Sequence, residues 1–102
     1  MYNKGKYMNL ELRNSHITIT GNLTNDKDFH SLKTAIEGLL ADYKTLVLEF
    51  HDTLVINSSL IGYLVNVVHQ KGIQVNIHTA NDTLYELIDY LGMHDIFNLK
   101  KI

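Results

Sequence analysis

The feature that most constrains the fold is a repeated change between two hydrophobic periods along the chain. Short segments with alternating or consecutive apolar residues, typical of strands, precede longer segments whose apolar residues recur every three or four positions, typical of helices. Strands that alternate with helices imply parallel strand pairs joined by right-handed crossovers. The pattern predicts strands near 8–13, 16–20, 45–50, 73–78 and 96–99, and helices near 26–43, 58–71 and 82–91.

Two of the predicted strands indicate how the sheet is covered. Residues 46–48 are consecutive apolar residues, as in a central strand that is covered on both faces. The strand at 73–78 instead alternates apolar and polar residues, so one of its faces is expected to meet water. The short turn between 8–13 and 16–20 predicts a hairpin. The expected fold class is therefore α/β, with a mixed sheet, an N-terminal hairpin and helices mainly on one face.

Length and composition exclude several classes of function. A chain of 102 residues fits one domain, expected over 8–102 after a flexible leader at 1–7. The formal net charge is −2 and the basic residues form no dense patch, so nucleic-acid binding is not expected. The absence of cysteine excludes disulfides and thiolate metal sites. No apolar segment approaches the roughly 20 residues that cross a bilayer, and the first residues lack the apolar core of a secretory signal. We expect a cytoplasmic protein without membrane insertion.

Two adjacent hydroxyl residues, Ser58 and Ser59, stand at the predicted start of the second helix. A helix N-terminus carries unsatisfied N–H groups and the positive end of the helix dipole, and both favour negative charge. A phosphate placed there would be stabilised by the helix while changing the surface that a partner meets. The simpler interpretation is that the serines only cap the helix, and Ser58 in particular is expected to be the cap or a packing contact.

The element order, with serines opening the helix after the third strand, resembles the STAS domain. That family includes anti-sigma-factor antagonists, relatives in bacterial signalling complexes and the cytoplasmic tails of sulfate transporters. The resemblance extends from about Met8 to Leu99 and is most specific from Leu46 to Gly62. There the family has an apolar strand, then an aspartate, two hydroxyl residues, a glycine, an apolar residue and another glycine. The corresponding residues of this chain are Asn57, Ser58, Ser59, Leu60, Ile61 and Gly62, and a second similarity covers Leu91 to Phe97.

The resemblance implies a non-enzymatic signalling protein that acts by binding other proteins. In signalling members of the family, the second hydroxyl residue, here Ser59, accepts a phosphate from a serine kinase of the histidine-kinase-like ATPase fold. The unphosphorylated domain binds that kinase or anti-sigma factor, phosphorylation releases it, and a PP2C-type phosphatase restores binding. The expected partner-binding residues are Asn57, Ser58, Ser59, Leu60, Ile61 and Gly62, together with the loops after Phe50 and before Asn25.

Two other functions stay open. Asn57 replaces the family's aspartate and Leu60 replaces a glycine. Both changes favour a constitutive scaffold, or a subunit of a transporter or multi-protein signalling complex, in which the serines are not phosphorylated. A sensor for a small ligand or nucleotide is a third possibility, although no glycine-rich loop supports it.

Catalysis, cofactors and metal binding are not expected. A hydrolase built on Ser59, His51 and Asp52 would need a glycine-flanked nucleophile, and Ser59 lies between Ser58 and Leu60. The carboxylates are dispersed and suggest no acid–base pair. The six histidines show no recognised ligand spacing and are expected to be ordinary surface or strand residues: His16, His30, His51, His69, His78 and His94.

Overall fold

The computed structural model describes residues 8–54 and 56–102. The predicted leader, 1–7, lies outside the described residues. Within these residues, no helix is both long and apolar enough to cross a membrane. The elements in chain order are β1 (Asn9–Arg13), β2 (His16–Thr20), α1 (Asp26–Leu40), β3 (Thr45–His51), α2 (Ser58–Lys71), β4 (Gln74–Thr79), α3 (Asp82–Tyr90) and β5 (Lys100–Lys101).

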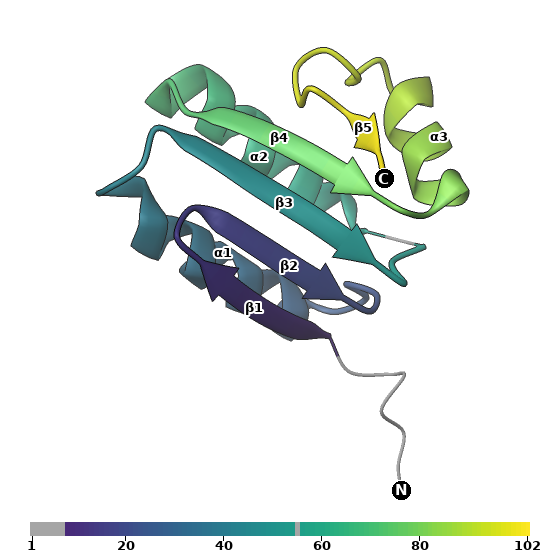
Figure 1. Ribbon diagram of the computed structural model, residues 1–102, viewed down its shortest axis with the longest axis horizontal. Coiled ribbons are helices and arrows are strands. Elements are labelled where there is room, and N and C mark those ends of the chain that lie inside the picture. The colour runs from purple at the N-terminus through teal and green to yellow at the C-terminus, as the bar shows by residue number, and fades with distance from the viewer. Residues whose placement is uncertain (1–7, 55) are drawn as a thin grey trace, which may run out of the picture.

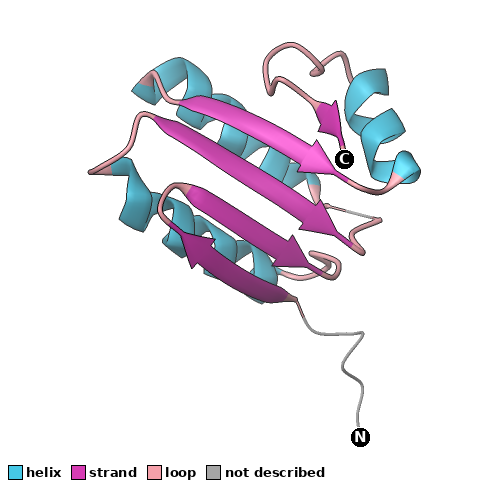
Figure 2. Cartoon of the chain, viewed as in Figure 1, coloured by secondary structure: helices cyan, strands magenta, loops and turns pink. Residues whose placement is uncertain are grey.

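The strands form one mixed sheet in the order β1-β2-β3-β4-β5. β1 and β2 make an antiparallel hairpin, and every later neighbouring pair is parallel. Figure 1 shows α1 and α2 behind the sheet and α3 beside β5, and Figure 2 shows that the other face of the sheet carries no helix. This arrangement confirms the predicted fold class, including the hairpin and the helices mainly on one face.

The core lies between the sheet and the helices. Alternate residues of each parallel strand point into this layer, because successive strand side chains face opposite sides. The fully buried residues include Ile17 and Ile19 of β2, Leu46, Leu48 and Phe50 of β3, Val75 and Ile77 of β4, Leu32 and Ile36 of α1, and Leu60, Leu64 and Val67 of α2.

The helices α1 and α2 also contact each other through Tyr63. Its ring packs edge-on against Phe29, with 6.1 Å between ring centroids, and the Lys33 ammonium lies 5.4 Å from its centroid. The Tyr63 hydroxyl donates to Glu37 Oε2 over 3.2 Å. Burial, followed by the neighbouring Glu37 charge, raises the pKa of Tyr63 above its usual range. These contacts fix the orientation of α2 against α1.

Two expectations about the strands are wrong. β3 is central but is covered on one face only, because Val47, Glu49 and His51 point to the uncovered side and are half-buried. The strand expected at 96–99 is a series of turns, and the last strand comes later, at Lys100–Lys101.

Candidate functional site

The two predicted serines are the first residues of α2 and follow the loop after β3. The N-cap is Asn57, whose Oδ1 accepts the N–H of Leu60 over 2.9 Å, so the expectation that Ser58 caps or packs is wrong. Ser58 and Ser59 are both exposed. Within the described residues, neither hydroxyl has a hydrogen-bond partner. Because the asparagine satisfies the helix end, both serine hydroxyls are left to the solvent.

The remaining residues of the predicted partner surface differ in exposure. Gly62 is exposed, with open space where a side chain would stand, and Ile61 is half-buried. Leu60 is 0% exposed, so the expectation that it belongs to a binding surface is wrong. It shares one helix stripe with Leu64 and Val67, and this stripe packs on the sheet.

The loops after β2 and β3 are tied together beside the start of α2. The Gly21 N–H donates to the carbonyl oxygen of His51 over 2.9 Å. The buried Thr53 hydroxyl lies 2.6 Å from the Gly21 carbonyl oxygen, and the Leu54 N–H donates to Asn22 Oδ1 over 2.7 Å. The sequence-based prediction named both loops as neighbours of the serines. In the structure, these hydrogen bonds join the two loops to each other. Leu54 remains 46% exposed, which gives this surface an apolar side chain.

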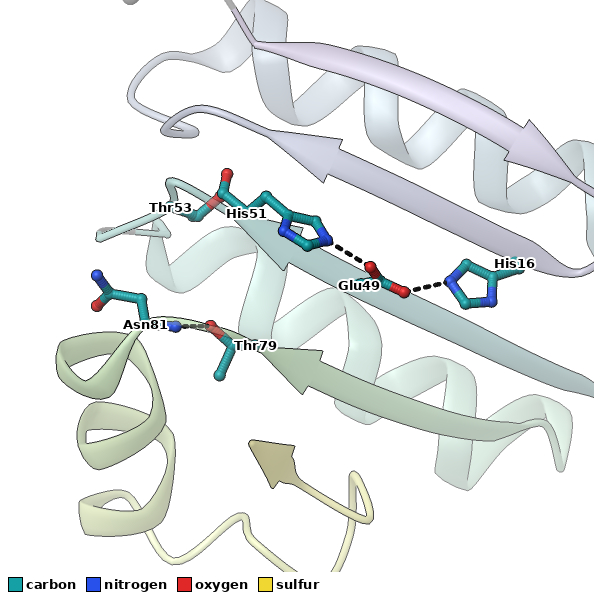
Figure 3. A network of polar contacts seen from close by, with 6 residues as sticks. All are labelled: His16, Glu49, His51, Thr53, Thr79 and Asn81. Atoms are coloured by element: carbon teal, nitrogen blue, oxygen red, sulfur yellow. Dashed lines mark hydrogen bonds and ion pairs between the residues drawn. The ribbon is translucent and has the colours of Figure 1, made fainter. Parts of the chain in front are cut away.

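A second polar group, not foreseen from the sequence, lies on the uncovered face of the sheet. Glu49 of β3 lies between two histidines, as Figure 3 shows. Its Oε1 is 2.8 Å from His16 Nε2 of β2, and its Oε2 contacts Nε2 of His51 on the same strand. His78 of β4 is the register partner of Glu49 on the other side. We call these residues, Glu49 with His16, His51 and His78, the open-face cluster.

The contacts in the open-face cluster shift two of its pKa values. The hydrogen bond with His51 lowers the pKa of Glu49 most, the contact with His16 lowers it further, and partial burial opposes both. Burial lowers the pKa of His78, and the nearby Lys100 charge adds to that effect, whereas Glu49 opposes it. The cluster therefore favours an ionised carboxylate and an uncharged His78 imidazole.

The open face also carries a hollow of about 910 Å³ near the hairpin. Its lining is mostly polar, unlike the apolar pockets typical of small-molecule sites. Among the described residues, no group of three or more histidine, aspartate or glutamate residues is placed to hold a metal ion. The hollow is lined by Glu11, Leu12, Arg13, Asn14, Ser15, His16, Thr18, Val47 and Glu49.

The sequence contains part of the pattern that could have revealed the open-face cluster. His16 and His78 occupy polar positions of alternating strands, so the sequence places them on uncovered strand faces. The expectation that β3 is covered on both faces left no exposed strand face on which Glu49 and His51 could join these histidines. The register that brings residues 33 positions apart into contact is not visible in local periodicity.

No family model matches the chain, and no curated protein matches it. The STAS interpretation therefore stays a prediction that rests on element order and on residues 57–62.

Proposed function

We propose that this chain is a STAS-like binding protein whose contact with a partner is switched by phosphorylation of Ser59. The partner is a serine kinase or anti-sigma factor of the histidine-kinase-like ATPase fold, and a PP2C-type phosphatase reverses the modification. Because such a kinase uses ATP, the proposal also places the protein in the cytoplasm.

The observation that carries the proposal is the exposed hydroxyl of Ser59 in the first turn of α2. Asn57 caps the helix, so a phosphate on Ser59 would displace no capping bond. The first turn of α2 holds no acidic residue that would repel it. The helix dipole would favour the phosphate by about 0.3–1 kcal/mol at an exposed site.

The expected effect of phosphorylation is release of the partner without refolding of the domain. The modification adds roughly −1.5 to −2 charges to a surface that otherwise presents hydroxyls and the exposed Leu54. A partner bound there would have to desolvate that charge. The core is spared, since the neighbouring Leu60 side chain points into it while Ser59 points to solvent.

The first test is phosphorylation itself, with the serine kinase encoded nearest to this gene as the probe. Incubation of the native protein with that kinase and ATP, followed by intact mass measurement, should show a single added phosphate. Ser58→Ala is the matched control and should accept phosphate like the native protein, whereas Ser59→Ala should accept none. Absence of phosphate on the native protein would contradict the switch and support the alternative of a constitutive scaffold.

The second test is capture of the same kinase in the absence of ATP. Native protein, Ser58→Ala and Ser59→Ala should bind the kinase, and Ser59→Asp should bind at least about tenfold more weakly because of the added charge. Equal binding by Ser59→Asp and Ser59→Ala would show that charge at this position does not control the contact.

A further inference from the structure

The last strand of the sheet, β5, is attached to β4 by few contacts. It has two residues, and the register pairs them as His78 with Lys100 and Thr79 with Lys101. Two backbone hydrogen bonds flank this pairing: the Ile77 N–H donates to the carbonyl oxygen of Phe97, and the Ile102 N–H donates to that of Thr79, both over 2.9 Å. Strand pairing this short depends strongly on each cross-strand pair of side chains.

His78 is the one member of the open-face cluster that lies next to β5. Each strand next to β4 brings one charged group toward His78: Glu49 on β3 and Lys100 on β5. His16, on β2 beyond β3, also acts on His78 through its charge. Glu49 is the only anion among them, and its two oxygens are already bound by His16 and His51. A proton on His78 would therefore place a positive charge directly opposite Lys100, and the Glu49 charge on the other side offsets this repulsion only in part. Like charges in that position destabilise strand pairing.

We propose that His78 makes the pairing of β5 sensitive to acid: a protonated imidazole opposite Lys100 weakens this pairing, so that β5 separates from β4 more often. Separation would free the pairing edge of β4 and expose Phe97 and Leu99, which are now buried. The inference is independent of phosphorylation at Ser59.

The direction of the pH dependence follows from the lowered pKa of His78. In the released state the imidazole titrates near its usual value, about 6.5, and so binds a proton more readily than in the paired state. The pairing is therefore at full strength above that pH and weakens as the pH falls through the lowered value. Glu49 stays ionised throughout this range, because its own pKa is lowered from the usual carboxylate range.

The test is amide hydrogen exchange measured by NMR at about pH 7.5 and pH 5, expressed as protection factors to remove the intrinsic pH effect. The amides of Ile77 and Ile102 report β5 pairing, and those of Gly21 and Val47, bonded to His51 and Ser15, report the β2–β3 side. On acidification, Ile77 and Ile102 should lose about two- to fivefold in protection, the range that one cross-strand pair contributes. The protection factors of Gly21 and Val47 should change less.

Variants distinguish the effect of the His78–Lys100 pair from a general effect of low pH on the protein. His78→Asn and Lys100→Gln each remove one charge of the pair. Each variant should therefore abolish the loss of protection of Ile77 and Ile102 at low pH. His69→Asn removes an exposed histidine of α2 and should leave the loss as in the native protein. The proposal is overturned if native protection of Ile77 and Ile102 is unchanged at low pH. It is also overturned if the loss persists in Lys100→Gln, or if all four amides lose protection equally.

Discussion

Glu49 uses both carboxylate oxygens within the sheet, one for His16 on β2 and one for His51 two residues along its own strand. This side chain therefore contacts two imidazoles at once. Hydrogen bonds to an ionised acceptor are stronger than those between neutral groups. The lowered pKa of Glu49 follows from these contacts, with His51 contributing most.

Replacement of Glu49 by glutamine should cost about 1 kcal/mol of unfolding free energy at pH 7, a value reduced by the partial exposure of the site. Because the folded pKa lies below the unfolded value of about 4.3, the stabilisation is present above that pH and is lost as the pH falls through the folded pKa. Urea unfolding of both proteins from pH 7 to pH 3 should therefore show a difference that shrinks with acid. Glu86→Gln, at an exposed residue of α3, is the control and should change little at any pH. A difference that stayed constant with pH would contradict the role of the ionised carboxylate.

The loop between β3 and α2 is an element in its own right, because it holds the start of α2 in place. Asp52 takes a left-handed conformation with φ 56°, which turns the chain directly after β3. Thr53 is 0% exposed, and its hydroxyl lies 2.6 Å from the Gly21 carbonyl oxygen and 3.2 Å from that of His51. The loop is thus fastened to the end of β2 before the chain reaches the serines.

Thr53→Val keeps the shape of the side chain but removes this hydroxyl, leaving a buried carbonyl oxygen with one fewer donor. The expected cost is about 1–2 kcal/mol of unfolding free energy, measured by urea titration. Thr45→Val, at an exposed position that begins β3, is the matched control and should cost less than about 0.5 kcal/mol. If the two variants lose equal stability, the loop is not held by this hydroxyl.

The sequence predicted the helices and strands well where one hydrophobic period extends over many residues. It predicted them poorly where tertiary contacts determine the local structure. The three helices carry long apolar stripes and side-chain caps, such as Asn25 accepting the Asp28 N–H over 2.9 Å. The segment 96–99 has apolar residues suited to a strand, yet it closes on itself through turns: the Leu99 N–H donates to the His94 carbonyl oxygen over 2.9 Å. Asn98 adopts φ 44°, which an extended strand does not allow.

The candidate site was predictable to a similar degree. Helical spacing placed Ser58 and Ser59 at the start of α2, because Leu60 and Leu64 set the helix stripe. The identity of the cap could not be read from local pattern, since Asn57 and Ser58 are both good capping residues. The open-face cluster depends on the parallel register of β2 and β3, which only the assembled sheet defines.

Residues 8–54 and 56–102 build one sheet, with its core on one side and a polar face on the other. The radius of gyration, 12.8 Å, is close to the roughly 13 Å expected for a compact domain of this length. α1 and α2 bury their apolar stripes against the same face of the sheet, so neither has a separate core. The protein is therefore expected to unfold as one cooperative unit.

Leu64 tests this view, because it lies on the α2 stripe and is 0% exposed. Leu64→Ala should lower the unfolding free energy by about 2–4 kcal/mol, since it leaves a cavity in the shared core. Leu12 is 51% exposed on the edge strand β1, so Leu12→Ala, the control, should cost less than about 1 kcal/mol. In both variants, urea transitions followed by circular dichroism and by tyrosine fluorescence should coincide, since helices and sheet lose one common core. Transitions that separate in Leu64→Ala would show that part of the structure unfolds before the rest, and the single-core description would then be wrong.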